Sequence, residues 1–260
     1  TTDRGKLLEG KRVVQVNNTP SDVGAFYKPD VVLVADAGAT ADNILFWMDE
    51  AEIPSSGFSK ELSSSDLAQH PRGKANASEL GFINLEFALD RLNEKLPKDR
   101  IVLTDGGRYI TEVWCRISVS DPNSFHMTDN FAAIGQGMQQ AIGAAHGDPD
   151  KPVILFTGDG GFMMGGMNEF NTAVRTGCNL IVVICNDSAY GAEHIQLKNR
   201  QMDPSITEFN WPSLAKVANT MGGQGIEVTT PDELESAIAA IETRKGPIVI
   251  ELKLDPNKVP

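Results

Sequence analysis

Short apolar runs separated by amphipathic stretches dominate the chain from residue 80 onward. The runs have the length of strands and contain almost no polar positions: 101–104, 153–157, 180–185, 225–228 and 247–252. Apolar residues recur at helical spacing in the segments around them: 84–96, 131–146, 167–176, 211–221 and 232–244. Strands without a polar face are typical of a parallel sheet that helices cover on both sides. The pattern predicts an α/β fold with a doubly wound parallel sheet over residues 81–260.

The first fifty residues show the same alternation on a smaller scale. Strands are predicted at 12–16 and 31–35, and an amphipathic helix at 41–50. Two strands and one helix bury too little surface to be stable alone. Residues 1–53 are therefore expected to be the C-terminal part of a central α/β domain. Residues 54–80, rich in serine, proline and charge, are expected to link it to the second domain.

Composition narrows the classes of function. The net charge of −12 disfavours nucleic acid as a partner, because phosphate backbones are bound mainly by basic side chains. No apolar run approaches the roughly 20 residues of a membrane-spanning helix, and residues 1–10 lack the apolar core of a signal peptide. The three cysteines form no CxxC pair, so neither a disulfide framework nor a structural zinc site is indicated. We expect a cytoplasmic protein that binds neither membrane nor nucleic acid.

Two aspartates follow neighbouring strands of the predicted sheet. Gly158-Asp159-Gly160-Gly161 comes after strand 153–157, and Asn186-Asp187 comes after strand 180–185. The helix 167–176 joins these strands as a right-handed crossover, so they are expected to be neighbours. Ligands of such sheets bind outside the carboxyl ends of the strands. Two carboxylates suit Mg²⁺, which shares its oxygen ligands with phosphates, and glycines let backbone N–H groups approach an anion. The motifs predict a magnesium-diphosphate site.

These motifs resemble those of the thiamine diphosphate-dependent enzymes of the acetolactate synthase, benzoylformate decarboxylase and pyruvate decarboxylase group. The family signature is Gly-Asp-Gly followed downstream by Asn-Asn, and the resemblance covers most of residues 80–255. It implies thiamine diphosphate and Mg²⁺ as cofactors, with Asp159, Asp187 and the carbonyl of Ala189 as metal ligands. Two positions depart from the family pattern, because Asp187 is usually Asn and Gly161 is often Ser.

The same resemblance implies further contacts to the cofactor. Arg108 and Tyr109, after strand 101–104, are candidates for contacts to the diphosphate. Ala132 would accept a hydrogen bond from the aminopyrimidine, and Ile134 would separate the two rings and impose a bent cofactor. Without the resemblance, Ile134 would be interpreted as a core residue of an apolar helix. The full expected cofactor-binding set is Arg108, Tyr109, Ala132, Ile134, Gly158, Gly160, Gly161, Tyr190 and Gly191.

Glu193 leaves two interpretations open. It lies six positions after Asp187, where the pyruvate decarboxylase branch has an acid that faces the substrate and the acetolactate synthase branch has an apolar residue. Glu193 could equally be an ordinary polar residue early in a helix. If it is functional, Glu193 and Ile134 are the catalytic candidates for decarboxylation or carboligation of a small-molecule 2-oxo acid.

The family activates its cofactor with a glutamate from the N-terminal domain of a neighbouring subunit, and nothing in this sequence corresponds to that domain. The chain is therefore expected to be the C-terminal portion of a longer enzyme, or one subunit of a split one, and to be inactive alone. The parent is expected to be a homodimer or homotetramer. One alternative is a non-catalytic cofactor-binding fragment that needs a partner. Another is a nucleotide-dependent oxidoreductase, which the missing dinucleotide fingerprint disfavours.

Overall fold

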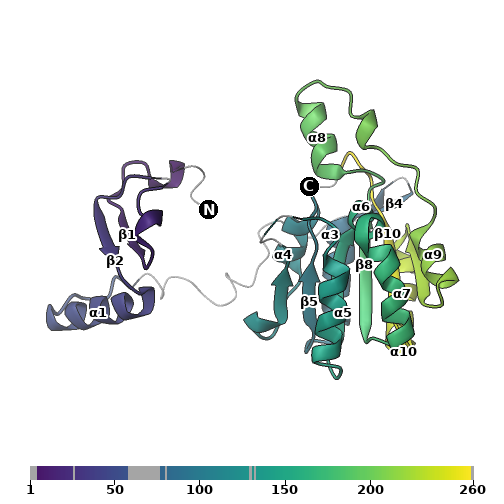
Figure 1. The fold of residues 1–260 in the computed structure, drawn as a ribbon, viewed down its shortest axis with the longest axis horizontal. Coiled ribbons are helices and arrows are strands. Elements are labelled where there is room, and N and C mark those ends of the chain that lie inside the picture. The colour runs from purple at the N-terminus through teal and green to yellow at the C-terminus, as the bar shows by residue number, and fades with distance from the viewer. Residues whose placement is uncertain are drawn as a thin grey trace. The chain divides into compact units, whose positions relative to one another are not determined.

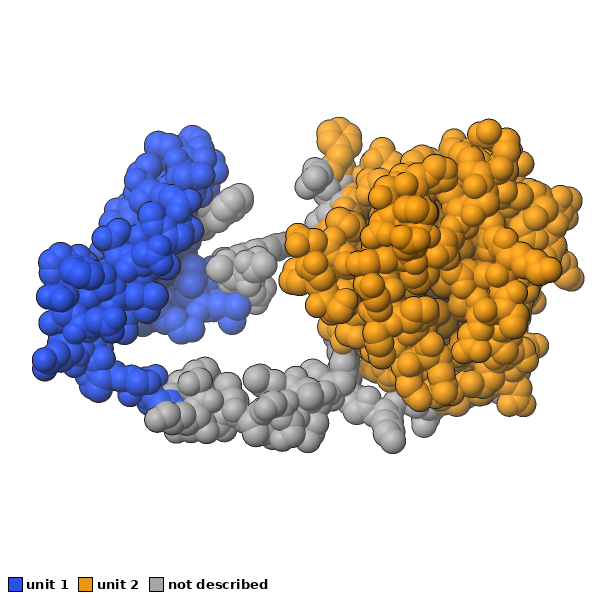
Figure 2. Space-filling model, turned by 90° about the horizontal axis from the view of Figure 1, so that it is seen from below, with its two compact units in different colours: residues 1–68 blue, residues 69–260 orange. Residues whose placement is uncertain are grey.

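The structure is a computed structural model that describes residues 5–25, 27–57, 77–79, 81–128, 131 and 133–258. The chain forms two compact units, residues 1–68 and 69–260, which are coloured separately in Figure 2. The division falls inside 54–80, the segment predicted to be a linker. Most of that segment lies outside the described residues, so its role as a linker stays a prediction.

The described residues of the first unit form two strands and one α-helix. β1 (Val14–Asn17) and β2 (Val31–Val34) pair in parallel, and α1 (Ala37–Glu50) follows. The helix begins before residue 41, where it was predicted to start. Asp36 caps it by accepting a hydrogen bond from Ala39 N at 2.9 Å.

The second unit contains a parallel sheet, of which Figure 1 labels β5, β8 and β10. The strand order is β6-β5-β7-β8-β10-β9. The strands are β5 (Ile101–Thr104), β6 (Phe125–Met127), β7 (Val153–Gly158), β8 (Leu180–Asn186), β9 (Gln224–Val228) and β10 (Ile248–Lys253). β7 and β8 pair along their length, so the predicted neighbours are confirmed. A separate antiparallel pair is formed by β3 (Ser78–Glu79) and β4 (Phe82–Ile83).

Helices cover both faces of this sheet. The described α-helices of this unit are α3 (Leu85–Lys95), α4 (Ile110–Arg116), α5 (Gly137–Gly147), α6 (Asp159–Gly161), α7 (Met167–Thr176), α8 (Gly191–Asn199), α9 (Leu214–Thr220) and α10 (Pro231–Thr243). α3, α4 and α10 contribute to one core cluster, and α5, α7 and α9 to the other. Successive strand residues alternate between the clusters, so Ile181 packs on one face and Val182 on the other. The predicted doubly wound α/β fold is confirmed. Among the described helices, none combines the length and apolar character that crossing a membrane requires.

Several elements differ from the predictions. α4, β6 and α8 were not predicted, because β6 is very short and α8 buries only His194. α5 was predicted to start at residue 131 but starts at Gly137, since Gly135 adopts a φ of +90° that interrupts the helix. α9 begins later than predicted, where Ser213 caps it.

The glycine-rich segment before residue 167 is helical, although only the part after it was predicted to be. α6 continues into a π-helical turn at Phe162–Gly166 and then into α7. Two of the glycines are needed in this segment because neighbouring atoms leave no room for a side chain. A Cβ at Gly166 would lie 3.2 Å from the ring of Phe162, and one at Gly165 would collide with the carbonyl of Gly135.

Candidate cofactor and metal site

Loops after three adjacent strands converge at one edge of the sheet. β5 has β6 on one side and β7 on the other, and a reversal of this kind opens a crevice at the carboxyl ends of the strands. The loops line a hollow of about 470 Å³, open solvent at its mouth included. Its lining comes from Gly106–Tyr109, Ile134, Gly158–Gly161, Cys185, Asp187, Ala189–Glu193 and Leu254.

Asp159 and Asp187 lie together in this hollow, at the ends of β7 and β8. Their exposed fractions are 2% and 7%. Burial and the charge of Asp187 raise the pKa of Asp159 to about 7. Burial also raises the pKa of Asp187 to about 6, although a hydrogen bond from Ala189 N and the charge of Arg108 lower it. Two buried carboxylates that repel each other when ionised form a site that a divalent cation would stabilise.

The oxygen atoms that the protein offers fit a cation that takes its remaining ligands from another molecule. Among the residues that the structure describes, no cluster of three or more His, Cys, Asp or Glu side chains could hold a metal. The protein therefore offers two carboxylates and backbone oxygens. Mg²⁺ commonly takes one or two carboxylates and completes its octahedron with phosphate oxygens and water, so the residues fit the predicted ion.

The loop that carries Asp187 is held by Asn186 and Glu251. Asn186 Oδ1 accepts hydrogen bonds from the N–H of Ser188 at 2.9 Å and from its hydroxyl at 3.2 Å, and Ser188 adopts a left-handed φ of 57°. Asn186 Nδ2 in turn donates to the fully buried Glu251 at 2.6 Å. This support holds a strained turn between Asp187 and Ala189. Glu251 was not predicted as a site residue, because its only signal in the sequence is a carboxylate inside an apolar strand.

Asp105 positions the loop before α5. Its buried carboxylate accepts hydrogen bonds from Gly135 N at 2.9 Å and from Thr128 Oγ1 at 3.2 Å. The loop presents Ile134, which is 40% exposed and lines both this hollow and a neighbouring one. The interpretation of Ile134 as a core residue of a helix is therefore wrong, because α5 starts only at Gly137. Asp105 was not among the predicted site residues.

Arg108 and Tyr109 both line the hollow but are engaged differently. The Tyr109 hydroxyl donates to the carbonyls of Asp105 at 2.7 Å and Phe156 at 3.1 Å. These hydrogen bonds link the residue after β5 to β7. Arg108 is half-buried, donates to Pro256 O at 3.1 Å, and its charge acts on Asp187. Of the two residues, Arg108 places a positive charge at the site.

Three of the predicted glycines are required by close packing. A Cβ at Gly160 would lie 2.7 Å from the ring of Tyr190, and one at Gly161 would lie 2.9 Å from the Asp105 carboxylate. One at Gly191 would collide with the Asp187 carboxylate. Any side chain at position 161 would therefore crowd the Asp105 carboxylate in this arrangement.

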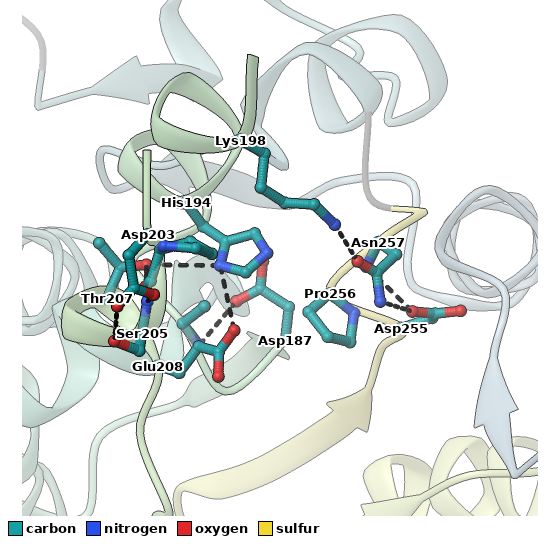
Figure 3. A network of polar contacts seen from close by, with 12 residues as sticks. Asp187, His194, Lys198, Asp203, Ser205, Thr207, Glu208, Asp255, Pro256 and Asn257 are labelled. Atoms are coloured by element: carbon teal, nitrogen blue, oxygen red, sulfur yellow. Dashed lines mark hydrogen bonds and ion pairs between the residues drawn. The ribbon is translucent and has the colours of Figure 1, made fainter. Parts of the chain in front are cut away.

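α8 carries the remaining candidate. Glu193 is exposed and lines the hollow, so both interpretations of it stay open. The adjacent His194 is buried and faces Thr207, with 3.4 Å between Nδ1 and Oγ1 (Figure 3). Lys198 donates to Asn257, which joins α8 to the C-terminal segment. Ala132 lies outside the described residues.

The part of the chain that contains this site matches a known family. The family model described as "Thiamine pyrophosphate enzyme, C-terminal TPP binding domain" matches residues 105–252, more than half of the chain. A putative acetolactate synthase large subunit of Mycobacterium tuberculosis is 32% identical over 170 residues, which are 65% of this chain and 30% of that protein. The acetolactate synthase of Bacillus subtilis is 23% identical over 252 residues, which are 95% of this chain and 44% of that protein.

The fold also matches solved structures. The thiamine diphosphate-dependent 4-hydroxybenzoylformate decarboxylase of Rhodococcus jostii RHA1 gives a TM-score of 0.73 at 20% identity, over 95% of this chain and 44% of that chain. This chain thus spans less than half the length of these relatives. It belongs to the thiamine pyrophosphate-dependent enzymes, and residues 105–252 correspond to their C-terminal cofactor-binding domain.

Proposed function

We propose that the second unit binds thiamine diphosphate through one Mg²⁺ ion, as the cofactor-binding part of an acetolactate synthase-like lyase or carboligase that acts on a small 2-oxo acid. The observation that carries this proposal is the pair Asp159 and Asp187, which are buried together at the ends of adjacent strands with raised pKa values. A divalent cation would favour the ionised form of both carboxylates and attract the diphosphate.

The residues of the chain take distinct parts in this proposal. Asp159, Asp187 and the Ala189 carbonyl hold the metal, Arg108 supplies positive charge to the diphosphate, and Ile134 supports the bent cofactor. When bound, thiamine diphosphate supplies an electron sink, while the protein contributes binding, orientation and electrostatics. Glu193 is an exposed carboxyl at the hollow, which suits proton transfer on the substrate side, although a purely structural role stays open.

Calorimetry with thiamine diphosphate, with and without Mg²⁺, tests the site. The wild-type chain should bind the cofactor only with the metal, and Asp159→Ala should abolish that binding, because no equivalent donor remains beside Asp187. Asp232→Ala removes an exposed aspartate of α10 and should leave binding unchanged. Undiminished affinity in Asp159→Ala would overturn the assignment.

A second candidate is a non-catalytic cofactor-binding subunit or fragment that needs a partner carrying the activating glutamate. We expect the chain alone to release no CO₂ from pyruvate or benzoylformate. Activation of the pyrimidine requires a carboxylate, and general acid–base help of this kind is worth roughly 10²–10⁴-fold. Activity should appear when a partner supplies the activating glutamate, and the complete enzyme should be a homodimer or homotetramer. Turnover by the isolated chain would assign the activating role to a glutamate within it, such as Glu193.

A further inference from the structure

Trp211 reaches the same site from a segment that sequence analysis did not connect with it. Its indole Nε1 donates a hydrogen bond to Asp159 Oδ2 at 2.7 Å, across 52 positions of sequence. An indole N–H can only donate, so it engages one carboxylate oxygen in a fixed direction. The contact therefore restricts the rotation of a side chain that we assign to the metal.

The indole is itself held by two other aromatic rings. Phe209 stacks on Trp211 with 4.5 Å between ring centroids and 15° between the ring planes. Tyr190 meets Phe209 edge-on, also at 4.5 Å, and its ring packs against Gly160, directly after Asp159. We call Tyr190, Phe209 and Trp211 the aromatic row. It makes contact with the Asp159 loop at both ends.

The backbone of this segment is attached to the loop of the second aspartate. Tyr190 N donates to Thr207 O at 2.9 Å, and Phe209 N donates to Ser188 O at 2.9 Å. These bonds flank an antiparallel bridge between Ala189 and Glu208. Residues 207–211 therefore bind the Asp187 loop through their backbone and Asp159 through Trp211, so one segment sets the relative position of both carboxylates.

Building on the proposed function, we propose that Trp211 is a positioning residue that holds Asp159 in the orientation that Mg²⁺ needs and so favours Mg²⁺ over Ca²⁺. Mg²⁺ demands near-ideal octahedral geometry at about 2.0–2.1 Å, whereas Ca²⁺ accepts flexible and bidentate carboxylates at about 2.3–2.6 Å. A carboxylate with one oxygen engaged by the indole is directed toward binding the metal through the other. Loss of the indole N–H would remove that restriction, and the affinity for Mg²⁺ should then fall more than the affinity for Ca²⁺.

Trp211→Phe tests this proposal because it keeps a ring against Phe209 but removes the N–H. Calorimetry in the presence of thiamine diphosphate should show Mg²⁺ affinity lowered by about 10–100-fold, the range for loss of a partner behind a metal ligand, and Ca²⁺ affinity lowered less. Trp47→Phe, at an exposed position of the first unit, should leave both affinities unchanged. An equal fall for the two ions would indicate general damage to the site and would overturn the proposal, as would no fall.

A second measurement does not depend on how Trp211→Phe folds. The chain has three tryptophans, so Trp47→Phe combined with Trp114→Phe leaves Trp211 as the only one. Its emission should change with Mg²⁺ in the presence of cofactor, saturating at the concentrations found by calorimetry. Unchanged emission during proven binding would contradict contact between Trp211 and the ligand shell.

The two proposals fail in different ways. If the wild-type chain binds no Mg²⁺ with the cofactor, the proposed function is wrong and the role of Trp211 fails with it. If the wild type binds, Asp159→Ala abolishes binding, and Trp211→Phe keeps the wild-type ratio of Mg²⁺ to Ca²⁺ affinity, only the role of Trp211 is wrong.

Discussion

The two units use similar apolar strands, but among the described residues only the strands of the second unit are buried. Val31 to Val34 of β2 are between 38% and 54% exposed, whereas the apolar residues of β8 have exposed fractions of no more than 3%. In the second unit, helices pack on both faces of the sheet. An apolar run therefore predicts that a strand forms, while its burial depends on what packs against it.

The helices show the same contrast. Leu45 and Trp47 of α1 are 59% and 66% exposed, whereas Phe170 and Ala173 of α7 are fully buried. Contiguous apolar surface of this kind marks a region that another element or chain covers. The second unit closes its own core and presents a site, while the described residues of the first leave large apolar side chains exposed.

The largest test of this contrast is a core truncation. Phe156→Ala removes a fully buried ring of β7 from the core cluster to which α3, α4 and α10 contribute and should lower the free energy of unfolding of the second unit by about 3–5 kcal/mol. Trp47→Ala, in the first unit, should change it by no more than about 0.5 kcal/mol. Urea unfolding followed by circular dichroism measures both. Similar effects of the two variants would remove the distinction between the units.

The buried aspartates should make the stability of the second unit depend on pH. Their pKa values are raised from 3.8 to about 7 and about 6 in the folded chain, so the folded state retains protons that the unfolded state has released. The contribution of these two carboxyls to stability without metal is therefore fully present below about pH 4 and is lost as the pH rises through 6 and 7. Asp159→Asn, which cannot ionise, should flatten this dependence in urea unfolding with a chelator. A wild-type curve parallel to that of the variant would contradict the raised pKa.

Asp187→Asn probes the departure from the family signature. The amide oxygen can still bind the metal but carries no charge, so Mg²⁺ affinity should fall by about tenfold, or 1.4 kcal/mol, while thiamine diphosphate remains bound at saturating Mg²⁺. Calorimetry of both ligands measures this. Complete loss of cofactor would show that Asp187 has another role, such as pairing with Arg108.

The smallest effect is expected from charge on the exposed face of α1. Leu45→Glu places a charge in the exposed apolar patch formed by Ile44 to Met48. It should therefore reduce the binding of a dye for apolar surfaces, and it should reduce self-association as measured by light scattering. The unfolding midpoint of the second unit should not move. Asn43→Glu adds the same charge beside the patch and should leave dye binding unchanged. Equal dye binding in the two variants would show that Leu45 is not part of a binding surface.

Much of the fold could be predicted from local pattern. The parallel sheet followed from apolar runs such as 180–185, and β7 lies beside β8 as the short crossover helix required. α8 escaped prediction because its sequence lacks an apolar stripe. β6 is held at the edge of the sheet by its pairing with β5 rather than by its own composition.

The site was predictable only where motif and strand end coincide. Asp159 and Asp187 met that condition, and the structure brings them together. Trp211 and Glu251 act on these loops over 52 and 65 positions of sequence, and no local pattern reveals such contacts. Asp105 was likewise visible only as a polar residue after a strand, until its hydrogen bonds to the loop before α5 were known.

The π-helical turn at Phe162–Gly166 has a consequence for insertions and deletions. A π turn holds about one residue more than an α turn, and each residue of an α-helix rotates the side chains by about 100°. Deleting one residue there would let the whole stretch wind as a regular α-helix. Either Phe170 would then leave its core contacts, or Asp159 would turn away from Asp187. The number of residues between Asp159 and α7 is therefore constrained. A deletion of one residue would disable the site even though every proposed metal ligand is kept.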